Sequence, residues 1–292
     1  MSESTLSIQS EDNGAHNGLF HKVVYLSATQ PRSLWPTCKH IFYIIKDKAY
    51  SLLIAPTGEP CVCIGYHKQG EVTQDLFLRF LFEKEAHLTQ PYLEYEVVLG
   101  QVPFLLIPAE LRDEAYDMAL TRLLIDEDLL QEELMETQLS NPDLHILWGV
   151  NSQMRYLLDF YLRDYQMRPL CELNLSLLPQ LEASKEGNVV LLTRLPGRVE
   201  IAVYQAGQLQ LCNAYAASAP MEELYYLQSV LEVIGLKSEE VACYVQGEAD
   251  PSGEEADSLW SRWSWLKLPS YPSLSDEIEA DQYWRYWFLA TG

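Results

Sequence analysis

Two stretches of the chain, about half its length apart, share one order of apolar and polar positions. Each has three short apolar runs separated by polar turns, then an amphipathic pattern of helical period, then another apolar run. Such runs, rich in β-branched and aromatic residues, predict strands that are covered on both faces of a sheet. The predicted strands are Ile41–Lys46, Tyr50–Ala55 and Cys61–Tyr66 in the first stretch, and Val189–Arg194, Val199–Tyr204 and Leu209–Tyr215 in the second.

Helical patterns complete each repeat. The first runs over Thr73–His87, and the second opens at Ser218 and ends at Gly235, where a glycine commonly terminates a helix. The other elements predicted from period and turn residues are an added edge strand at His21–Ser27, strands at Val97–Leu99, Phe104–Ile107, Leu144–Val150, Leu170–Leu173 and Val241–Val245, and helices at Arg112–Leu124, from the cap Asn151-Ser152 to Gln166, and at Leu175–Ser184.

The duplication predicts two similar α/β lobes that face each other across a cleft. Residues 1–38 are expected to be an N-terminal extension, disordered at its polar start. The first lobe is predicted to span residues 39–187 and the second residues 188–292, because the polar, glycine-containing segment Lys185–Asn188 is the best boundary.

Charge and composition narrow the function classes. The chain has 20 Lys and Arg against 42 Asp and Glu, a net charge of −22, and a surface of this sign repels nucleic acid and anionic membranes. No apolar run approaches the ~20 residues that span a bilayer, and the N-terminus lacks the basic and apolar regions of a secretory signal. The six cysteines are scattered, mostly in apolar strands, as in a reducing compartment. We therefore expect a cytoplasmic protein without nucleic-acid binding or membrane insertion.

Three segments carry a resemblance to known proteins: Phe104–Leu111, Gly207–Tyr215 and Glu223–Leu236. From about Lys39 onward, the chain resembles an uncharacterised bacterial family, domain of unknown function 3822, which is associated with an actin-like ATPase fold. The second lobe also looks like the ATPase-like domain of the M-type assembly proteins of type IV pili. The resemblance implies a duplicated actin-like (ribonuclease H-like) α/β fold, with a mixed five-stranded sheet and flanking helices in each lobe. A resemblance of this kind indicates a fold more directly than an activity.

The resemblance also implies where a nucleotide would bind. In an actin-like ATPase, a glycine hairpin in each lobe approaches the phosphates, and an aspartate beside each hairpin holds Mg²⁺ and its waters. Here the first hairpin carries Asp47 and Lys48 but no glycine. The second carries Gly197, yet Thr193 stands where active ATPases place the aspartate.

The third mark of a nucleotide site is the segment that would clamp adenosine, which here has Gly247 followed by acids. All three marks are degraded together, so we expect no required cofactor and no ATPase activity. If Mg·ATP binds, then Asp47, Lys48, Gly197 and Gly247 are the candidate residues. The structural interpretation of Asp47 and the two glycines is that they are turn residues.

Other chemistries find less support. A ribonuclease H-like nuclease needs carboxylates on its first strand to hold two metals, and neither Ile41–Ile45 nor Val189–Leu192 has one. Cys61 and Cys63 share one strand face but lack two further ligands near by, so no metal site is predicted.

The C-terminal region is rich in aromatic residues. Trp260 and Trp263 recur at helical spacing, as do Trp284 and Trp287. Two interpretations remain open, since these rings either close the second lobe or form an exposed patch that binds a partner protein.

We conclude that the chain is a non-catalytic or degenerate actin-like protein that acts as a cytoplasmic scaffold for a protein partner. The alternative is an ATP-binding switch or weak ATPase that uses the inter-lobe cleft.

Overall fold

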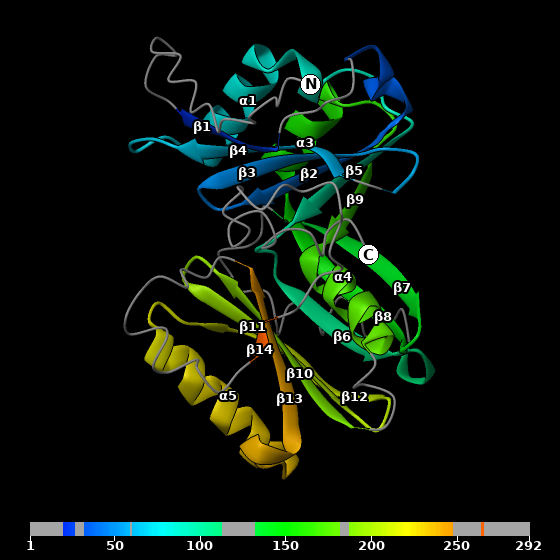
Figure 1. The fold of residues 1–292 in the computed structure, drawn as a ribbon, viewed down its shortest axis with the longest axis vertical. Coiled ribbons are helices and arrows are strands. Elements are labelled where there is room, and N and C mark those ends of the chain that lie inside the picture. Colours follow the sequence, from blue (N-terminus) through cyan, green and yellow to red (C-terminus); the bar gives the residue numbers. More distant parts are fainter. Residues whose placement is uncertain are drawn as a thin grey trace, which may run out of the picture. The chain divides into compact units, whose positions relative to one another are not determined.

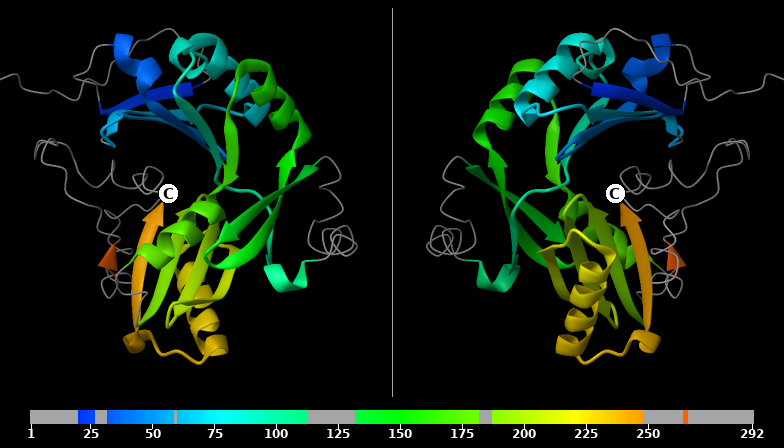
Figure 2. Two further views of the ribbon diagram at one scale, coloured as in Figure 1. Left: turned by 90° about the vertical axis from the view of Figure 1, so that its right-hand side faces the viewer. Right: turned by 90° about the vertical axis from the view of Figure 1, so that its left-hand side faces the viewer.

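The computed structural model describes residues 20–26, 32–58, 60–112, 132–181, 187–247 and 264–265 as a mixed α/β protein (Figures 1 and 2). The chain divides into two units. Of the described residues, unit 1 contains those up to Val98 together with Gln153–Met167, and unit 2 contains Leu99–Ser152 and those from Arg168 onward. The expected domain boundary between residues 187 and 188 stays a prediction.

Unit 1 is built on a sheet of strand order β1-β4-β3-β2-β5-β9. Five of its strands form the expected lobe, and β1 is the predicted added edge strand, paired antiparallel with β4. Continuous burial along β2, β3 and β4 agrees with strands that are covered on both faces. The strands are β1 (Phe20–Leu26), β2 (Lys39–Ile45), β3 (Lys48–Ile54), β4 (Pro60–Lys68), β5 (Glu94–Leu99) and β9 (Gln166–Pro169).

Two helices pack together in unit 1, α1 (Gln74–Lys84) and α3 (Ser152–Tyr161). The rings of Phe82 on α1 and Tyr161 on α3 stack with centroids 5.1 Å apart, and the Tyr161 hydroxyl donates to Glu83 at 3.0 Å. Phe82 also lies 5.5 Å, centroid to centroid, from Phe42 of β2. These aromatic contacts attach the helix pair to the sheet.

Unit 2 contains a mixed five-stranded sheet of order β12-β11-β10-β13-β14. Strand β10 pairs antiparallel with β11 and parallel with β13, so its carboxyl end lies beside that of β13. The strands are β10 (Asn188–Leu195), β11 (Arg198–Gln205), β12 (Gln208–Ala216), β13 (Val241–Gly247) and β14 (Ser264–Trp265).

Helices cover both faces of this sheet. Helix α5 (Pro220–Ile234) packs on the face that carries Val199, Ile201 and Val203. Helix α4 (Leu170–Leu177) contacts Glu200 on the opposite face, as expected from the two-residue period of a strand. Figure 1 shows the two helices on opposite sides of the strands.

A second, three-stranded sheet in unit 2 is inserted between β5 and α3. Its order is β6-β8-β7, with β6 (Phe104–Pro108), β7 (Glu132–Ser140) and β8 (Asp143–Asn151). The turn between β7 and β8 falls at Asn141-Pro142, a dipeptide that favours turns.

The predicted duplication is confirmed by the chain order of the elements. The series β2-β3-β4-α1-β5 recurs as β10-β11-β12-α5-β13, and the strands take equivalent places in the two sheets. Gly58 and Gly207 lie in equivalent turns, with φ of 84° and 78°. The α/β fold class, with mixed sheets and flanking helices, is therefore confirmed, although β1 makes the first sheet six-stranded.

One segment was predicted incorrectly. Residues 170–173 were expected to form a strand and 175–184 a helix, but the helix α4 begins at Leu170 and the strand β9 precedes it. Almost every side chain of α4 is buried, and its polar residues Glu172, Asn174 and Ser176 recur at every second position, so its sequence does not show a helical period. The helix predicted to run to Gln166 ends at Tyr161.

Some predicted elements lie beyond the part of the chain that the structure describes. The helix expected at Arg112–Leu124 falls there except for its first residue, as does the polar start of the N-terminal extension. Within the described part, no helix is both long and apolar enough to cross a membrane.

Candidate functional site

Asp47 and Lys48, the predicted nucleotide residues of unit 1, lie at the hairpin between β2 and β3. The Asp47 carboxylate forms an ion pair with Lys68 at the end of β4, with Oδ1 and Nζ 2.7 Å apart. The Lys68 N–H also donates to the Asp47 carbonyl at 2.8 Å. Asp47 thus joins the hairpin to its neighbouring strand, which is the turn role that the structural interpretation assigned to it.

Gly197 and Gly247, the predicted nucleotide residues of unit 2, lie at strand ends. Gly197 is in the β10–β11 hairpin, and its carbonyl accepts the Ala217 N–H at 3.1 Å. Gly247 ends β13 and pairs with Arg194 of β10. Nucleotide binding by these residues stays a prediction. The four partner candidates Trp260, Trp263, Trp284 and Trp287 lie outside the described residues.

A buried polar network occupies the carboxyl ends of β10 and β13. The Gln246 amide Nε2 donates to Thr193 Oγ1 at 2.8 Å and to Asn174 Oδ1 of α4 at 2.6 Å. The Asn174 amide in turn lies 3.3 Å from Glu200 Oε2 on β11. Thr193 is the residue at the expected magnesium position. Its hydroxyl is therefore hydrogen-bonded to a neutral side chain inside the fold.

Glu200 ends this network as a buried acid beside Arg198. Its Oε1 lies 3.2 Å from Arg198 Nη2, which also donates to the Val102 carbonyl at 3.0 Å. Burial raises the pKa of Glu200 to about 7, since the loss of solvation outweighs the favourable effects of Arg198 and Asn174. The carboxyl therefore exchanges its proton close to neutral pH.

A second buried charge pair joins β10 to α5. Arg194 Nε lies 3.0 Å from Glu223 Oε1 and 2.8 Å from Oε2, with both side chains almost completely covered. Glu223 lies in the first turn of α5, where a carboxylate is favoured by the helix dipole. Burial raises the pKa of Glu223, and the adjacent guanidinium opposes that rise.

The core of unit 1 contains a hydrogen-bonded histidine and serine. His40 Nε2 lies 2.8 Å from Ser51 Oγ, and both side chains are fully buried. Burial lowers the pKa of His40 well below its ordinary value. A nucleophile–base pair has this geometry, but these groups have no access to a substrate, so they act as a core hydrogen bond.

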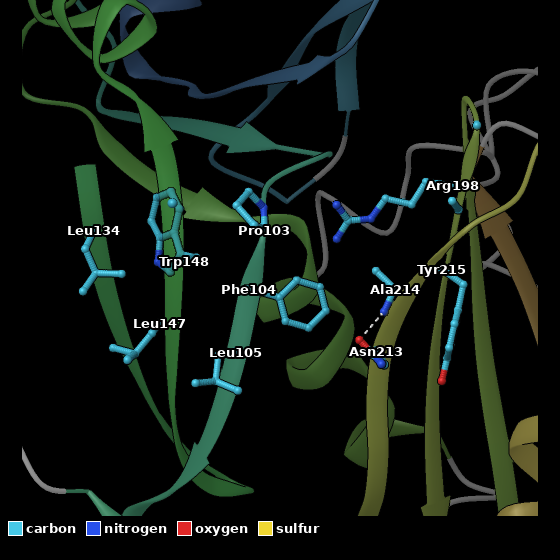
Figure 3. Close-up of a pocket in the computed structure, with 13 residues that line it drawn as sticks. Pro103, Phe104, Leu105, Leu134, Leu147, Trp148, Arg198, Asn213, Ala214 and Tyr215 are labelled. Atoms are coloured by element: carbon cyan, nitrogen blue, oxygen red, sulfur yellow. Dashed lines mark hydrogen bonds between the residues drawn. The ribbon is translucent and has the colours of Figure 1, made fainter. Parts of the chain in front are cut away.

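A pocket of about 390 Å³ lies between β6 and β12 of unit 2 (Figure 3). Residues 103–105 line one side, residues 213–216 line the other, and Trp148 of β8 contributes apolar surface. Arg198 is the one charged residue among those that line it, and its guanidinium lies 5.7 Å from the centroid of the Phe104 ring. This lining offers apolar contact and strand backbone to a ligand.

The β10–β11 hairpin is anchored beside this pocket. Gln101 Nε2 donates to the Pro196 carbonyl at 2.7 Å, next to the contact between Arg198 and Val102. Pro196 and Arg198 flank Gly197, the glycine that was predicted to approach phosphate. Both of its neighbours are therefore hydrogen-bonded to residues 101–102. The described residues contain no group of three His, Cys, Asp or Glu side chains that could hold a metal ion.

The sequence predicted neither the buried polar network around Gln246 nor the pocket between β6 and β12. Glu200 had a visible signal, because it is the one acid inside the apolar run Val199–Tyr204. Asn174 and Gln246 had none, since they are distant in sequence and meet only when α4 covers the sheet.

Comparisons with known proteins agree with the fold. Residues 48–259 match the model of a family described as protein of unknown function, DUF3822. A crystal structure from Bacteroides thetaiotaomicron, of a protein with actin-like ATPase fold and unknown function, superposes with a TM-score of 0.72 at 15% identity, covering 80% of this chain and 91% of that one. No curated protein matches this sequence significantly.

A second solved structure comes from a PilM–PilN type IV pilus biogenesis complex. It superposes with a TM-score of 0.53 at 9% identity, covering 86% of this chain and 95% of the other. At these identities the likeness shows the fold alone. The predicted resemblance to both groups of proteins is confirmed.

Replacing Gly247 by alanine should destabilise unit 2 more than replacing Gly197. Both have positive φ, 90° and 72°, but a Cβ at Gly247 would lie 2.3 Å from the Arg194 carbonyl oxygen, whereas Gly197 has open space. We expect a loss of about 3 kcal/mol or more for Gly247→Ala and about 1 kcal/mol for Gly197→Ala in urea unfolding. Equal losses would show that the close approach of β10 and β13 is wrong.

Glu200 should make stability fall as pH rises from about 4.5 to about 7. Its pKa is raised in the folded chain, from 4.5 to about 7, so folding favours the protonated acid and this stabilisation disappears through that window. Glu200→Gln should abolish the dependence, and the free energy of unfolding of the variant relative to the natural chain should rise by on the order of 3 kcal/mol between pH 5 and 8.

Urea unfolding of the natural chain and Glu200→Gln at both pH values measures this difference. Glu232→Gln, on the exposed side of α5, is the matched control. A difference between natural chain and variant that does not change with pH would remove Glu200 as the titrating group.

Proposed function

Because the chain belongs to DUF3822, a family of proteins of unknown function, we propose its role from its site: it is a non-catalytic actin-like protein that binds another protein. The observation that carries this is the Thr193–Gln246–Asn174 network. Three uncharged, hydrogen-bonded side chains stand where the resemblance expects a carboxylate that binds magnesium.

The network is poorly suited to a divalent cation. Mg²⁺ is held by carboxylates and retains several waters. Thr193, Gln246 and Asn174 are uncharged and nearly inaccessible to solvent. A metal would have to break their mutual hydrogen bonds inside the core, which leaves buried polar groups unpaired at a cost of ~1–3 kcal/mol each.

The hairpin of unit 1 supports the same function. The Asp47 carboxylate already has a cationic partner, Lys68, at 2.7 Å. A magnesium ion or a phosphate group that bound there would have to compete with this ion pair. The hairpin therefore has a use in the fold that needs no nucleotide.

A protein partner is supported by a relative of the same fold. The PilM–PilN structure is a complex from type IV pilus biogenesis, so a protein of this fold binds a second protein there. The apolar pocket between β6 and β12 is a surface of the kind that binds protein better than nucleotide, since its lining has a single charged residue that is already paired.

An ATP-binding switch is the second candidate. It is favoured by the 46% exposure of the Asp47 side chain and by the positive φ of Gly197 and Gly247, which leaves strand-end backbone in an unusual conformation. Asp47 and Lys48 would then take part in holding phosphate and Mg²⁺.

Thermal unfolding should be insensitive to Mg·ATP and Mg·ADP at millimolar concentration. A ligand that binds only the folded state adds ~2.7 kcal/mol at ~100 times its dissociation constant, which raises the midpoint by several degrees. We expect no rise relative to an EDTA control. A saturable rise that Asp47→Ala abolishes would replace the scaffold by the nucleotide switch.

Protein binding needs its own measurement. Cross-linking of the full chain in its native cells, with mass spectrometry, would nominate a partner, and the purified pair should form a saturable complex of fixed stoichiometry. If no nominated protein forms such a complex, the scaffold function is wrong.

A further inference from the structure

Two sheets of unit 2 end at the same pocket. Strand β12 is the outer strand of the five-stranded sheet, and β6 is the outer strand of the three-stranded sheet, as far as the described residues show. Figure 3 shows the two strands on either side of the pocket, with the Phe104 ring directed into the space between them. Each strand thus presents one edge to the pocket that pairs with no described strand.

The backbone of β12 directs hydrogen-bonding groups into this space. The Ala217 N–H donates to Gly197 of the β10–β11 hairpin, so antiparallel alternation turns the N–H and C=O of Ala216 and Ala214 away from β11. The Ala214 N–H is held at 2.8 Å by Oδ1 of its neighbour Asn213. A local side chain therefore occupies the position that the carbonyl of an added strand would take.

Strand β6 presents its edge in the same way. Gly149 of β8 donates to the Pro103 carbonyl at 3.0 Å, so the alternate residues Phe104 and Leu106 direct their N–H and C=O groups away from β8. The pocket is thus bordered by backbone donors and acceptors on both sides, with apolar side chains between them.

The first sheet shows what covers such an edge. Strand β4 is the equivalent of β12, and the added strand β1 pairs antiparallel with it from Phe20 to Leu26. This segment reads Phe-His-Lys-Val-Val-Tyr-Leu, which is apolar with basic residues. The duplicated lobe has no described counterpart of β1 on β12.

Charge and surface indicate the kind of segment that fits. The chain carries a net charge of −22, which attracts a cationic partner. Beside β12, the ring of Tyr215 stacks on Tyr226 at 4.7 Å, and Tyr226 meets Tyr225, which is 65% exposed. Apolar surface thus continues from the strand onto α5.

Building on the proposed scaffold function, we propose that an extended segment of the partner protein adds as a strand to the edge of β12 that pairs with no described strand. Its backbone replaces Asn213 as the partner of Ala214, and its alternate side chains, which are apolar, fill the pocket against Phe104 and Leu105. Lys or Arg residues flank the apolar positions. Strand addition gains affinity from main-chain hydrogen bonds and specificity from side-chain pockets.

The test uses the full chain and a panel of fluorescent ten-residue peptides with Val, Ile or Leu at alternate positions, Thr between them and Lys at both ends. In each peptide, the backbone nitrogens along one edge of the extended strand are methylated, which prevents the peptides from associating with one another. We expect at least one member to bind with a dissociation constant below ~1 mM, to weaken with added salt, and to slow hydrogen exchange at the amides of Ala214 and Ala216. Peptides methylated on both edges should not bind.

Ala214→Pro removes the outward N–H without removing a hydrogen bond to β11, a change that edge strands tolerate. It should weaken peptide binding by about 10-fold or more, while the matched Ala214→Ser retains it. Circular dichroism and the unfolding midpoint verify folding, and hydrogen exchange in the natural chain gives the same answer without any variant.

Three results would overturn strand addition: no binding peptide, binding without protection of these amides, or protection already complete in the free chain. The last would mean that another segment or a second copy covers β12, and self-association with rising concentration would identify the second copy. If the purified partner complex survives Ala214→Pro unchanged, the scaffold function stands and this docking site falls.

Discussion

The amide nitrogen of Gln246 donates to Thr193 and to Asn174, and with this it fastens β13 to β10 and both strands to α4. In a low-dielectric interior such a network either satisfies its members or costs ~1–3 kcal/mol for each group left unpaired. Because Asn174 also contacts Glu200, the position of α4 determines the surroundings of the buried acid on β11. The face of the second sheet opposite α5 is therefore organised by polar side chains.

This network lies where the resemblance to actin-like ATPases would place magnesium. Parallel strand ends are where α/β proteins usually place a ligand, since unpaired backbone groups gather there. In this chain, side chains of the fold hydrogen-bond one another at these strand ends, and Arg194 forms an ion pair with Glu223 between the neighbouring strand and helix α5.

The sequence predicted the repeated frame well, because strands covered on both faces and helices with one apolar side leave periodic marks. It failed at α4, which is covered on nearly all sides and whose polar residues Glu172, Asn174 and Ser176 recur at every second position, so residues 170–173 were predicted as a strand. The contacts of Asn174, Glu200 and Gln246 depend on tertiary packing, and which edges of β6 and β12 pair with no described strand depends on register. Neither can be read from residue types alone. The roles of Asp47, Lys48, Gly197 and Gly247 in binding nucleotide remain predictions.

The order of strands along the chain also determines when the first sheet can be completed during synthesis. Its last strand, β9, follows the whole three-stranded insertion, and α3, whose Tyr161 stacks on Phe82 of α1, lies between the two. A nascent chain that has left the ribosome only as far as β8 therefore carries an open edge at β5 and an α1 surface without its aromatic partner. Such an intermediate must wait for about twenty more residues, on the order of seconds at ribosomal speed. The insertion thus delays closure of the sheet in which it is embedded, and until β9 emerges the edge of β5 offers unpaired backbone groups to any other strand.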